Sequence, residues 1–304
     1  MKLVSFGLAL IASAATASPT TSVQGPVKTA PPQLHIVLTP LPAAPGGNPP
    51  ASMQWLYGSG EAAALSMASY RAFQNYAVAT ARRRPTSSVV LSGDATLRNP
   101  RFVPCGRKPL AVVLDVDETT LLNAGYEYDQ AAQNRSYDPK RWSDWERTGI
   151  SATQEVPGVF TALKAIRAAG IKVIFISNRS LENVAKTELA LDEFSLGPAR
   201  HLKELFVTGD APGGSAKDPR RAMIASRYCV VAMAGDQLGD FSDLFNSSEA
   251  QVPARRSAAM AWHVSQLWGN GWFVLPNPVY GTGVKGNFYE VFPSARWSDS
   301  AGGQ

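Results

Sequence analysis

Short apolar runs alternate with amphipathic segments between about residues 110 and 275. The apolar runs predict strands, because continuous apolar stretches between helices are typical of strands buried on both faces of a parallel sheet. These runs cover residues 110–114, 171–176, 204–208, 229–234 and 272–275. The amphipathic segments predict helices over residues 157–169, 181–194 and 218–227. The alternation predicts an α/β fold, with a Rossmann-like parallel sheet and helices on both of its faces.

Two further segments complete the predicted domain. Residues 54–81 have the apolar spacing of an N-terminal helix. The residues predicted to share its apolar side are Leu56, Ala63, Met67, Tyr70, Phe73 and Tyr76. An arginine run and a proline end this helix, and breaker residues predict a loop over residues 85–108. Residues 122–156 are aromatic and polar, do not fit the alternation, and predict a small cap inserted after the first strand.

The N-terminus has the pattern of a secretory signal peptide over residues 1–17. Lys2 precedes an apolar stretch, and Ala15 and Ala17 offer a small-residue cleavage site. A Pro-rich leader at 18–50, predicted to be disordered, is followed by the folded domain at 51–292 and a C-terminal tail at 293–304. A lipoprotein signal needs a cysteine directly after the cleavage site, and none stands there, which excludes a lipid anchor of that kind. The pattern predicts a periplasmic or secreted protein without a stable membrane anchor after signal cleavage.

The composition narrows the class of ligand. The 304 residues carry a formal net charge of +5, and 45% of them are hydrophobic, enough for one core with a small cap. A basic surface attracts anions, but no dense Lys/Arg stripe interleaved with aromatics is present, which argues against a nucleic-acid polymer as partner. The two cysteines, Cys105 and Cys229, could form a disulfide in an exported chain or remain buried thiols. The oligomeric state stays open.

Candidate catalytic residues follow the predicted strands. Asp115 and Asp117 come directly after the strand at residues 110–114, at the strand end where open parallel sheets bind ligands. With this spacing one carboxylate can attack phosphorus while the other moves a proton. Ser177, after the next strand, can bind a phosphoryl oxygen through its hydroxyl. Lys217, just before a predicted helix, can neutralise the charge of a phosphate group. Lys203 is the alternative candidate, although Lys203 lies before a predicted strand and not after one.

Two more carboxylates, Asp236 and Asp240, follow the strand at residues 229–234. Carboxylates together with waters provide the octahedral oxygen site that Mg²⁺ requires. A turn at Gly235 brings both residues to the same edge of the predicted sheet as Asp115. The sequence therefore predicts a magnesium site beside the candidate nucleophile.

These elements, in this order, resemble the haloacid dehalogenase-like superfamily. In detail they are similar to its bacterial class C acid phosphatases, a group that includes 5'-nucleotidase lipoproteins. The likeness rests first on residues 113–123 with Tyr126, and on residues 175–179. It covers roughly residues 54 to 292, and its other matches are Gln54, Trp55, Glu61, Trp142, Trp145, Pro157, Gly158, Arg220, Arg221, Gly235, Asp236 and residues 276–281.

The resemblance implies a role for each residue. Asp115 would attack the phosphoryl group and form an aspartyl-phosphate. Asp117 would protonate the leaving alcohol and then activate water. Ser177 and Lys217 would hold the phosphoryl group. The metal site would consist of the Asp115 carboxylate, the Asp117 backbone carbonyl and Asp236, with Asp240 as a ligand or an anchor.

The resemblance also implies an exported Mg²⁺-dependent acid phosphatase that hydrolyses small phosphomonoesters, including nucleoside 5'-monophosphates. The residues predicted to bind the substrate are Thr119, Asn178, Arg179 and Tyr126. The sequence departs from the family pattern at two places, of which the second concerns contacts with the substrate and the first is expected to have little effect. Gln237 stands where the family usually has Asn, and residues 282–285 replace its usual Asp-Trp-Glu.

The sequence also bears on other classes of protein. The only histidines, His35, His201 and His263, form no motif of a histidine-dependent phosphatase, and a serine-hydrolase elbow is absent from the sequence. A non-catalytic phosphoester-binding or storage protein on the same scaffold would lack the nucleophile, whereas Asp115 and Asp117 are both present. A phosphotransferase that passes the phosphoryl group to an alcohol remains open.

Overall fold

The computed structural model describes residues 46–246 and 252–292, so the predicted signal peptide and tail lie outside the described residues. A five-stranded sheet forms the centre of the domain, with strand order β7-β6-β3-β8-β9 and every neighbouring pair parallel. The strands are β3 (Leu110–Leu114), β6 (Lys172–Ser180), β7 (Leu205–Thr208), β8 (Cys229–Gly235) and β9 (Trp272–Val274). The predicted parallel α/β sheet is confirmed.

Both faces of the sheet are covered, because its strands alternate their side chains between two apolar clusters. Val112 and Leu114 of β3 point to one cluster, whereas Ala111 and Val113 point to the other. On the first face lie α2 (Gly60–Arg83), α5 (Val159–Ala168) and α6 (Val184–Glu193); on the second lie α7 (Asp218–Arg227) and α9 (Trp262–Ser265). The sheet is therefore buried on both sides, as its continuous apolar strands require.

The N-terminal helix differs from the prediction in two respects. Ser59 divides it into α1 (Ala51–Gly58) and α2, because the Ser59 side chain caps the second helix by accepting a bond from the Ala62 amide at 3.1 Å. The predicted apolar side was also wrong in part, since Met67 is 47% exposed. The buried stripe of α2 consists of Ala62, Ser66, Tyr70, Phe73 and Ala77.

The segment predicted as a loop over residues 85–108 contains an antiparallel pair, β1 (Ser87–Leu91) and β2 (Phe102–Pro104). Trp272 of the central sheet donates its indole N–H to the Val89 carbonyl at 2.9 Å, so the pair packs against the core. Just after β2, Cys105 forms a disulfide with Cys229 at the start of β8. This disulfide lies at the amino-terminal edge of the sheet, where Cys229 pairs with Leu110.

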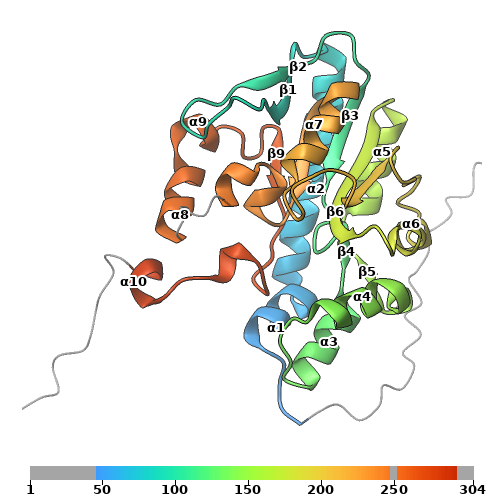
Figure 1. Cartoon of the computed structure of the whole chain (residues 1–304), viewed down its shortest axis with the longest axis vertical. Coiled ribbons are helices and arrows are strands. Elements are labelled where there is room, and N and C mark those ends of the chain that lie inside the picture. The colour runs from blue at the N-terminus through green and yellow to red at the C-terminus, as the bar shows by residue number, and fades with distance from the viewer. Residues whose placement is uncertain (1–45, 247–251, 293–304) are drawn as a thin grey trace, which may run out of the picture. The chain divides into compact units, whose positions relative to one another are not determined.

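The segment inserted after β3 is closed at its base by β4 (Leu121–Leu122) and β5 (Gln154–Glu155), which pair antiparallel. Between them lie α3 (Ala124–Ala132), α4 (Pro139–Thr148) and the short turn η1 (Ile150–Ala152). We call residues 121–155 the cap segment. Its two helices lie at the end of the domain opposite the β1–β2 pair (Figure 1). Asp138 starts α4 by accepting a bond from the Arg141 amide at 2.8 Å.

Short elements follow β8 and β9: η2 (Leu238–Asp240), η3 (Asp243–Asn246), α8 (Val252–Met260), α9, η4 (Thr282–Val284) and α10 (Phe288–Val291). The strand pattern did not predict the helices among them, because they are too short for a helical period to show. Among the described residues, no helix combines the length and apolar character that a membrane crossing requires.

Candidate active site

The candidate site lies where the chain changes direction across the sheet. From β3 the chain continues to β6 and β7 on one side, then crosses back to β8 and β9 on the other. Ligands of open α/β sheets bind at such a switch point, outside the carboxyl ends of the strands. Asp115 follows β3 there, and Asp236 follows β8. The backbone amide of Asp115 donates to the Ala234 carbonyl at 3.0 Å, which ties the two strand ends together.

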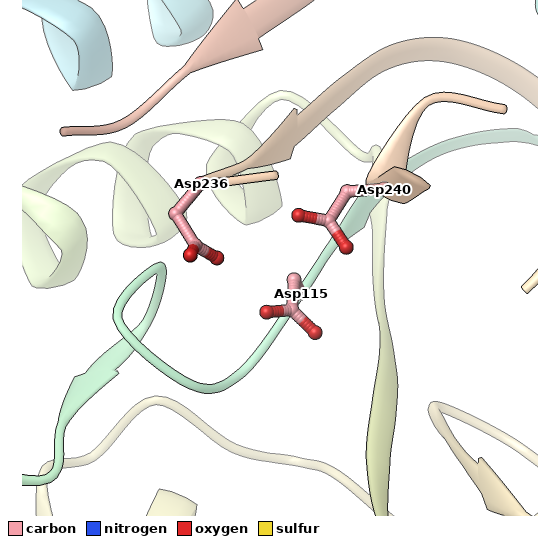
Figure 2. Close-up of side chains that lie close together, drawn as sticks. All are labelled: Asp115, Asp236 and Asp240. Carbon is pink, nitrogen blue, oxygen red and sulfur yellow. The ribbon is translucent and has the colours of Figure 1, made fainter. Parts of the chain in front are cut away.

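Three buried carboxylates meet at this point. Oxygen atoms of Asp115, Asp236 and Asp240 all lie within 4.8 Å of one another, and Figure 2 shows the three carboxylates converging. Gly235 makes this approach possible, since a Cβ atom there would come within 2.2 Å of the Asp240 Cβ. The Asp240 carboxylate also accepts a bond from the Gln237 amide at 2.8 Å. A tight turn therefore holds Asp240 against the strand end.

Lys217 supplies the positive charge inside this cluster. Its ammonium group forms a short hydrogen bond with Asp115 and lies 2.6 Å from the Asp240 carboxylate. Lys217 occupies the residue before α7, and Asp243 fixes that helix start by accepting bonds from the amides of Lys217 at 2.9 Å and Asp218 at 2.6 Å. The helix start thus aims the lysine at the strand ends. In the described structure Lys217, and not Lys203, is the lysine that forms hydrogen bonds with this cluster.

Burial and mutual repulsion shape the charges of the cluster. Burial raises the pKa of Asp115 well above its usual range, while the Lys217 ammonium opposes that rise. Burial, followed by the charge of Asp240, raises the pKa of Asp236 to about 6. Burial lowers the pKa of Lys217, but the charges of Asp115 and Asp240 outweigh this effect and raise the pKa above its usual range. The lysine thus stays charged, and one ammonium faces three carboxylates.

The donors present fit a hard divalent cation. Buried carboxylates are costly unless they are paired or bind a metal, and the side chains that donate to Asp236 are all neutral. They are Thr119 at 3.0 Å, Asn277 at 2.8 Å and Gln237 at 2.9 Å. A group of carboxylate oxygens without sulfur or imidazole suits Mg²⁺ or a similar oxygen-binding cation. Asp115, Asp236 and Asp240 are the residues that could hold it.

Asp117, in the turn that follows β3 (residues 115–120), is held by several donors. The Arg179 guanidinium lies 2.8 Å from one of its carboxylate oxygens. The side-chain amide of Asn123 donates to the same oxygen at 3.0 Å. Ser177 donates to the other oxygen at 3.2 Å. Ser177 and Arg179 belong to β6, so the neighbouring strand fixes the Asp117 side chain. Both residues contact Asp117 in this structure, although the sequence predicts that they contact the substrate.

Glu118 connects the turn after β3 to two segments that are distant in the sequence. Its backbone has a φ of 53°, a conformation unusual for a residue other than glycine. Its buried carboxyl group accepts hydrogen bonds from the Tyr57 hydroxyl of α1 at 3.1 Å and from the Tyr280 hydroxyl. It also accepts one from the backbone N–H of Asn123 at 2.8 Å. Burial, followed by the charge of Asp117, raises the pKa of Glu118 to about 8. These contacts hold the strained turn in place.

The other predicted substrate residues lie at varied positions. Thr119 is fully buried and donates to Asp236, so it supports the cluster of carboxyl groups instead of facing a substrate. Asn178 is exposed, and its side-chain oxygen accepts a bond from Arg220 at 2.6 Å. Tyr126 is 4% exposed and packs in the cap segment with its ring centroid 5.0 Å from that of Trp142.

Several residues that build the site have no role predicted from the sequence, although some of them lie in the matched motifs. Arg220 is buried and binds the carbonyls of Ser177 and, at 3.0 Å, Ala216, so it joins β6 to the loop before Lys217. Asn277 and Asp243 were assigned no role. Asn123 and Glu118 lie inside the motif that was recognised, so their position beside Asp117 was the available signal.

A carboxyl group beside an ammonium group, within a cluster of three carboxyl groups at the ends of parallel strands, is an arrangement suited to phosphoryl transfer. The model of the family described as HAD superfamily, subfamily IIIB (Acid phosphatase) matches residues 68–283, and the chain belongs to this family. The chain is therefore a phosphomonoesterase, and the predicted family is confirmed.

Solved structures have the same fold. The class C acid phosphatase from Bacillus anthracis matches with a TM-score of 0.61 and 24% identity, covering 76% of this chain and 84% of that chain. The class C acid phosphatase from Bacillus anthracis with tungstate bound matches with a TM-score of 0.64 and 21% identity, covering 82% of this chain and 96% of that chain.

Proposed function

We propose that the protein is an exported, Mg²⁺-dependent acid phosphatase that forms an aspartyl-phosphate on Asp115. The observation that carries this proposal is the Asp115 carboxylate at the end of the central strand, paired with Lys217 and surrounded by Asp236 and Asp240. A nucleophilic carboxylate must be unprotonated, and the ammonium of Lys217 favours that state against the effect of burial.

In the first step an Asp115 carboxylate oxygen attacks phosphorus and forms a new O–P bond. The bond between phosphorus and the ester oxygen breaks, and the departing alcohol takes a proton from Asp117. Lys217 stabilises the negative charge on the phosphoryl oxygens. A bound Mg²⁺ would supply further charge neutralisation at these oxygens.

In the second step Asp117, now a carboxylate, removes a proton from water. The water oxygen attacks phosphorus, the O–P bond to Asp115 breaks, and inorganic phosphate leaves. Arg179 and Asn123 hold the Asp117 carboxylate in one orientation through both steps. The same residue thus acts first as a general acid and then as a general base.

Nucleoside 5'-monophosphates are the proposed substrates among small phosphomonoesters. A groove of about 690 Å³ beside α1 is lined in part by Met53, Trp55 and Tyr57. Tyr57 also donates a hydrogen bond to Glu118, which links the lining of the groove to the turn that carries Asp115 and Asp117. Aromatic side chains such as Trp55 and Tyr57 offer a stacking surface for a nucleobase.

Export is proposed from the N-terminal sequence pattern, and the disulfide supports it. The bond between Cys105 and Cys229 would persist in the periplasm or outside the cell, whereas the cytosol keeps thiols reduced. Mass spectrometry of the mature protein from a periplasmic or secreted fraction tests the cleavage site after residue 17. An intact N-terminus in that fraction would contradict a cleavable signal.

The catalytic proposal is tested by phosphate release from p-nitrophenyl phosphate, nucleoside 5'-monophosphates and a sugar phosphate. We expect EDTA to stop release and Mg²⁺ to restore it, and Asp115→Asn to abolish turnover. Asp94→Asn is the matched control, because Asp94 lies in an exposed loop with 61% of its side chain accessible. Full release in EDTA would refute metal dependence, and turnover by Asp115→Asn would refute the nucleophile. A faster sugar phosphate would refute the nucleotide preference.

A further inference from the structure

Asn123 is a fully buried residue of the cap segment, three residues after the turn at residues 115–120. Its side-chain Nδ2 donates to Asp117 at 3.0 Å and to Glu118 at 3.1 Å. Its side-chain Oδ1 accepts from Arg179 at 2.9 Å and from the Trp145 indole at 2.8 Å. Every polar atom of this amide therefore has partners, as a buried amide requires.

These partners allow only one orientation of the amide. Arg179 and Trp145 offer only N–H donors, so they require the carbonyl oxygen of Asn123. Asp117 and Glu118 present acceptor oxygens to the other end, and so they require the NH₂ group. A rotation of the amide by 180° would place a carbonyl against two carboxyl groups and an NH₂ against two donors. The four neighbours thus fix the N–H that points at Asp117.

The Asn123 side chain does not cap helix α3, although Asn123 stands at the N-cap position of that helix. Asn123 is the N-cap residue of α3, where an asparagine side chain usually accepts a bond from the first turn of its helix. No such capping bond is present at Asn123 in the described structure. Its side-chain oxygen is used instead by Arg179 of β6 and Trp145 of α4.

We propose that Asn123 is a positioning residue for the catalytic acid Asp117, and that Trp145 of the cap segment sets its orientation. The proposal rests on the proposed function, because it assumes that Asp117 protonates the leaving alcohol. Asn123 does not touch the reacting atoms. It holds the Asp117 carboxyl group where the ester oxygen departs, and the indole N–H prevents the amide from turning over.

The dependence of the rate on the leaving group tests this proposal. p-Nitrophenol leaves readily without a proton, whereas a simple alcohol, as in glycerol phosphate, leaves only when protonated. The measured quantity is kcat/KM, which reports the steps up to loss of the alcohol. We expect Asn123→Ala to lose on the order of ten-fold more kcat/KM on glycerol phosphate than on p-nitrophenyl phosphate, a part of what a general acid contributes. Asp117→Asn should show the same selectivity to a larger extent.

A purely structural role for Asn123 would lower kcat/KM equally on both substrates. Equal losses for Asn123→Ala, with a selective loss for Asp117→Asn, would overturn the proposal and leave the role of Asp117 intact. Equal losses for Asp117→Asn would overturn the acid role and the proposal with it. The two failures are therefore distinguishable.

Trp145→Phe provides a second test if Asn123→Ala does not fold. This variant removes the indole N–H that contacts Asn123 and keeps an aromatic ring in the cap segment. We expect a smaller loss of kcat/KM than for Asn123→Ala, again selective for glycerol phosphate. Trp142→Phe, one turn away on α4, makes the same chemical change as a control. A substrate selectivity equal in the two tryptophan variants would overturn the part assigned to Trp145.

Discussion

Removal of the disulfide is expected to lower stability without lowering activity. The bond joins Cys105, just after β2, to Cys229 at the start of β8, and both residues are buried. Replacing both with alanine removes the bond without leaving a lone thiol or adding a polar group to the core. The variant Cys105→Ala/Cys229→Ala therefore isolates the effect of the covalent link, apart from the loss of two small buried sulfur atoms.

The size of the effect follows from the length of chain that the bond closes. The two cysteines are separated by 124 residues in the sequence. Closing a loop of that length lowers the entropy of the unfolded chain by an amount worth about 5 kcal/mol in the chain-entropy account. For a domain of this size, each kcal/mol shifts the melting temperature by roughly 2 to 4 °C. We expect the variant to melt about 10 to 20 °C below the wild type.

The assay is thermal unfolding followed by circular dichroism, with and without dithiothreitol. Reductant should lower the melting temperature of the wild type towards that of the variant and leave the variant unchanged. The kcat at a temperature where both are folded should be the same, because the disulfide lies at the edge of the sheet opposite Asp115. Equal melting temperatures for the oxidised wild type and the variant would refute the reasoning.

Two further predictions concern charge. Lys217→Met removes the ammonium between Asp115 and Asp240, and we expect kcat/KM to fall by about 10² to 10³-fold in steady-state assays; a loss below about three-fold would contradict the role of this charge. Burial raises the pKa of Glu127 from 4.5 to about 7, with the Arg141 charge opposing the rise. The folded state thus retains a proton that the unfolded chain releases, and stability falls as pH rises from about 4.5 to 7, by up to about 3 kcal/mol. Glu127→Gln should therefore melt above the wild type at pH 8 and close to it at pH 5, whereas the exposed Glu182→Gln should match the wild type at both; an equal effect of Glu127→Gln at both pH values would contradict this assignment.

The apolar runs predicted the sheet well because each strand is buried on both faces. Such a strand has no alternating polar residues that face solvent, so its apolar run is easy to recognise. β3 and β8 accordingly begin at the predicted residues. The β1–β2 pair escaped prediction because Gly93 and neighbouring polar residues between the strands look like an ordinary loop. Only contact with Trp272, far along the chain, makes that pair part of the core.

The site was predictable where chemistry and strand ends coincide. Asp115, Lys217, Asp236 and Asp240 do converge: Asp115 and Asp236 directly follow a strand, Lys217 precedes a helix, and Asp240 ends the short helix η2 after β8. Partners inside the site were harder to predict, because they depend on side-chain direction. Thr119 could equally face a substrate or a carboxylate, and only the folded turn shows that it donates to Asp236.

The paired β4 and β5 place the two ends of the cap segment next to each other, since Leu121 faces Glu155 and Leu122 faces Gln154. A segment whose ends meet can gain or lose residues without pulling β3 and β6 out of register. Residues of the cap segment that contact neither Asn123 nor β6 can therefore change without disturbing the strands that carry Asp115 and Asp117. A chain built in this way can acquire a new substrate range by rebuilding those parts of residues 124–153, while it keeps Asn123, Trp145 and its phosphoryl-transfer chemistry.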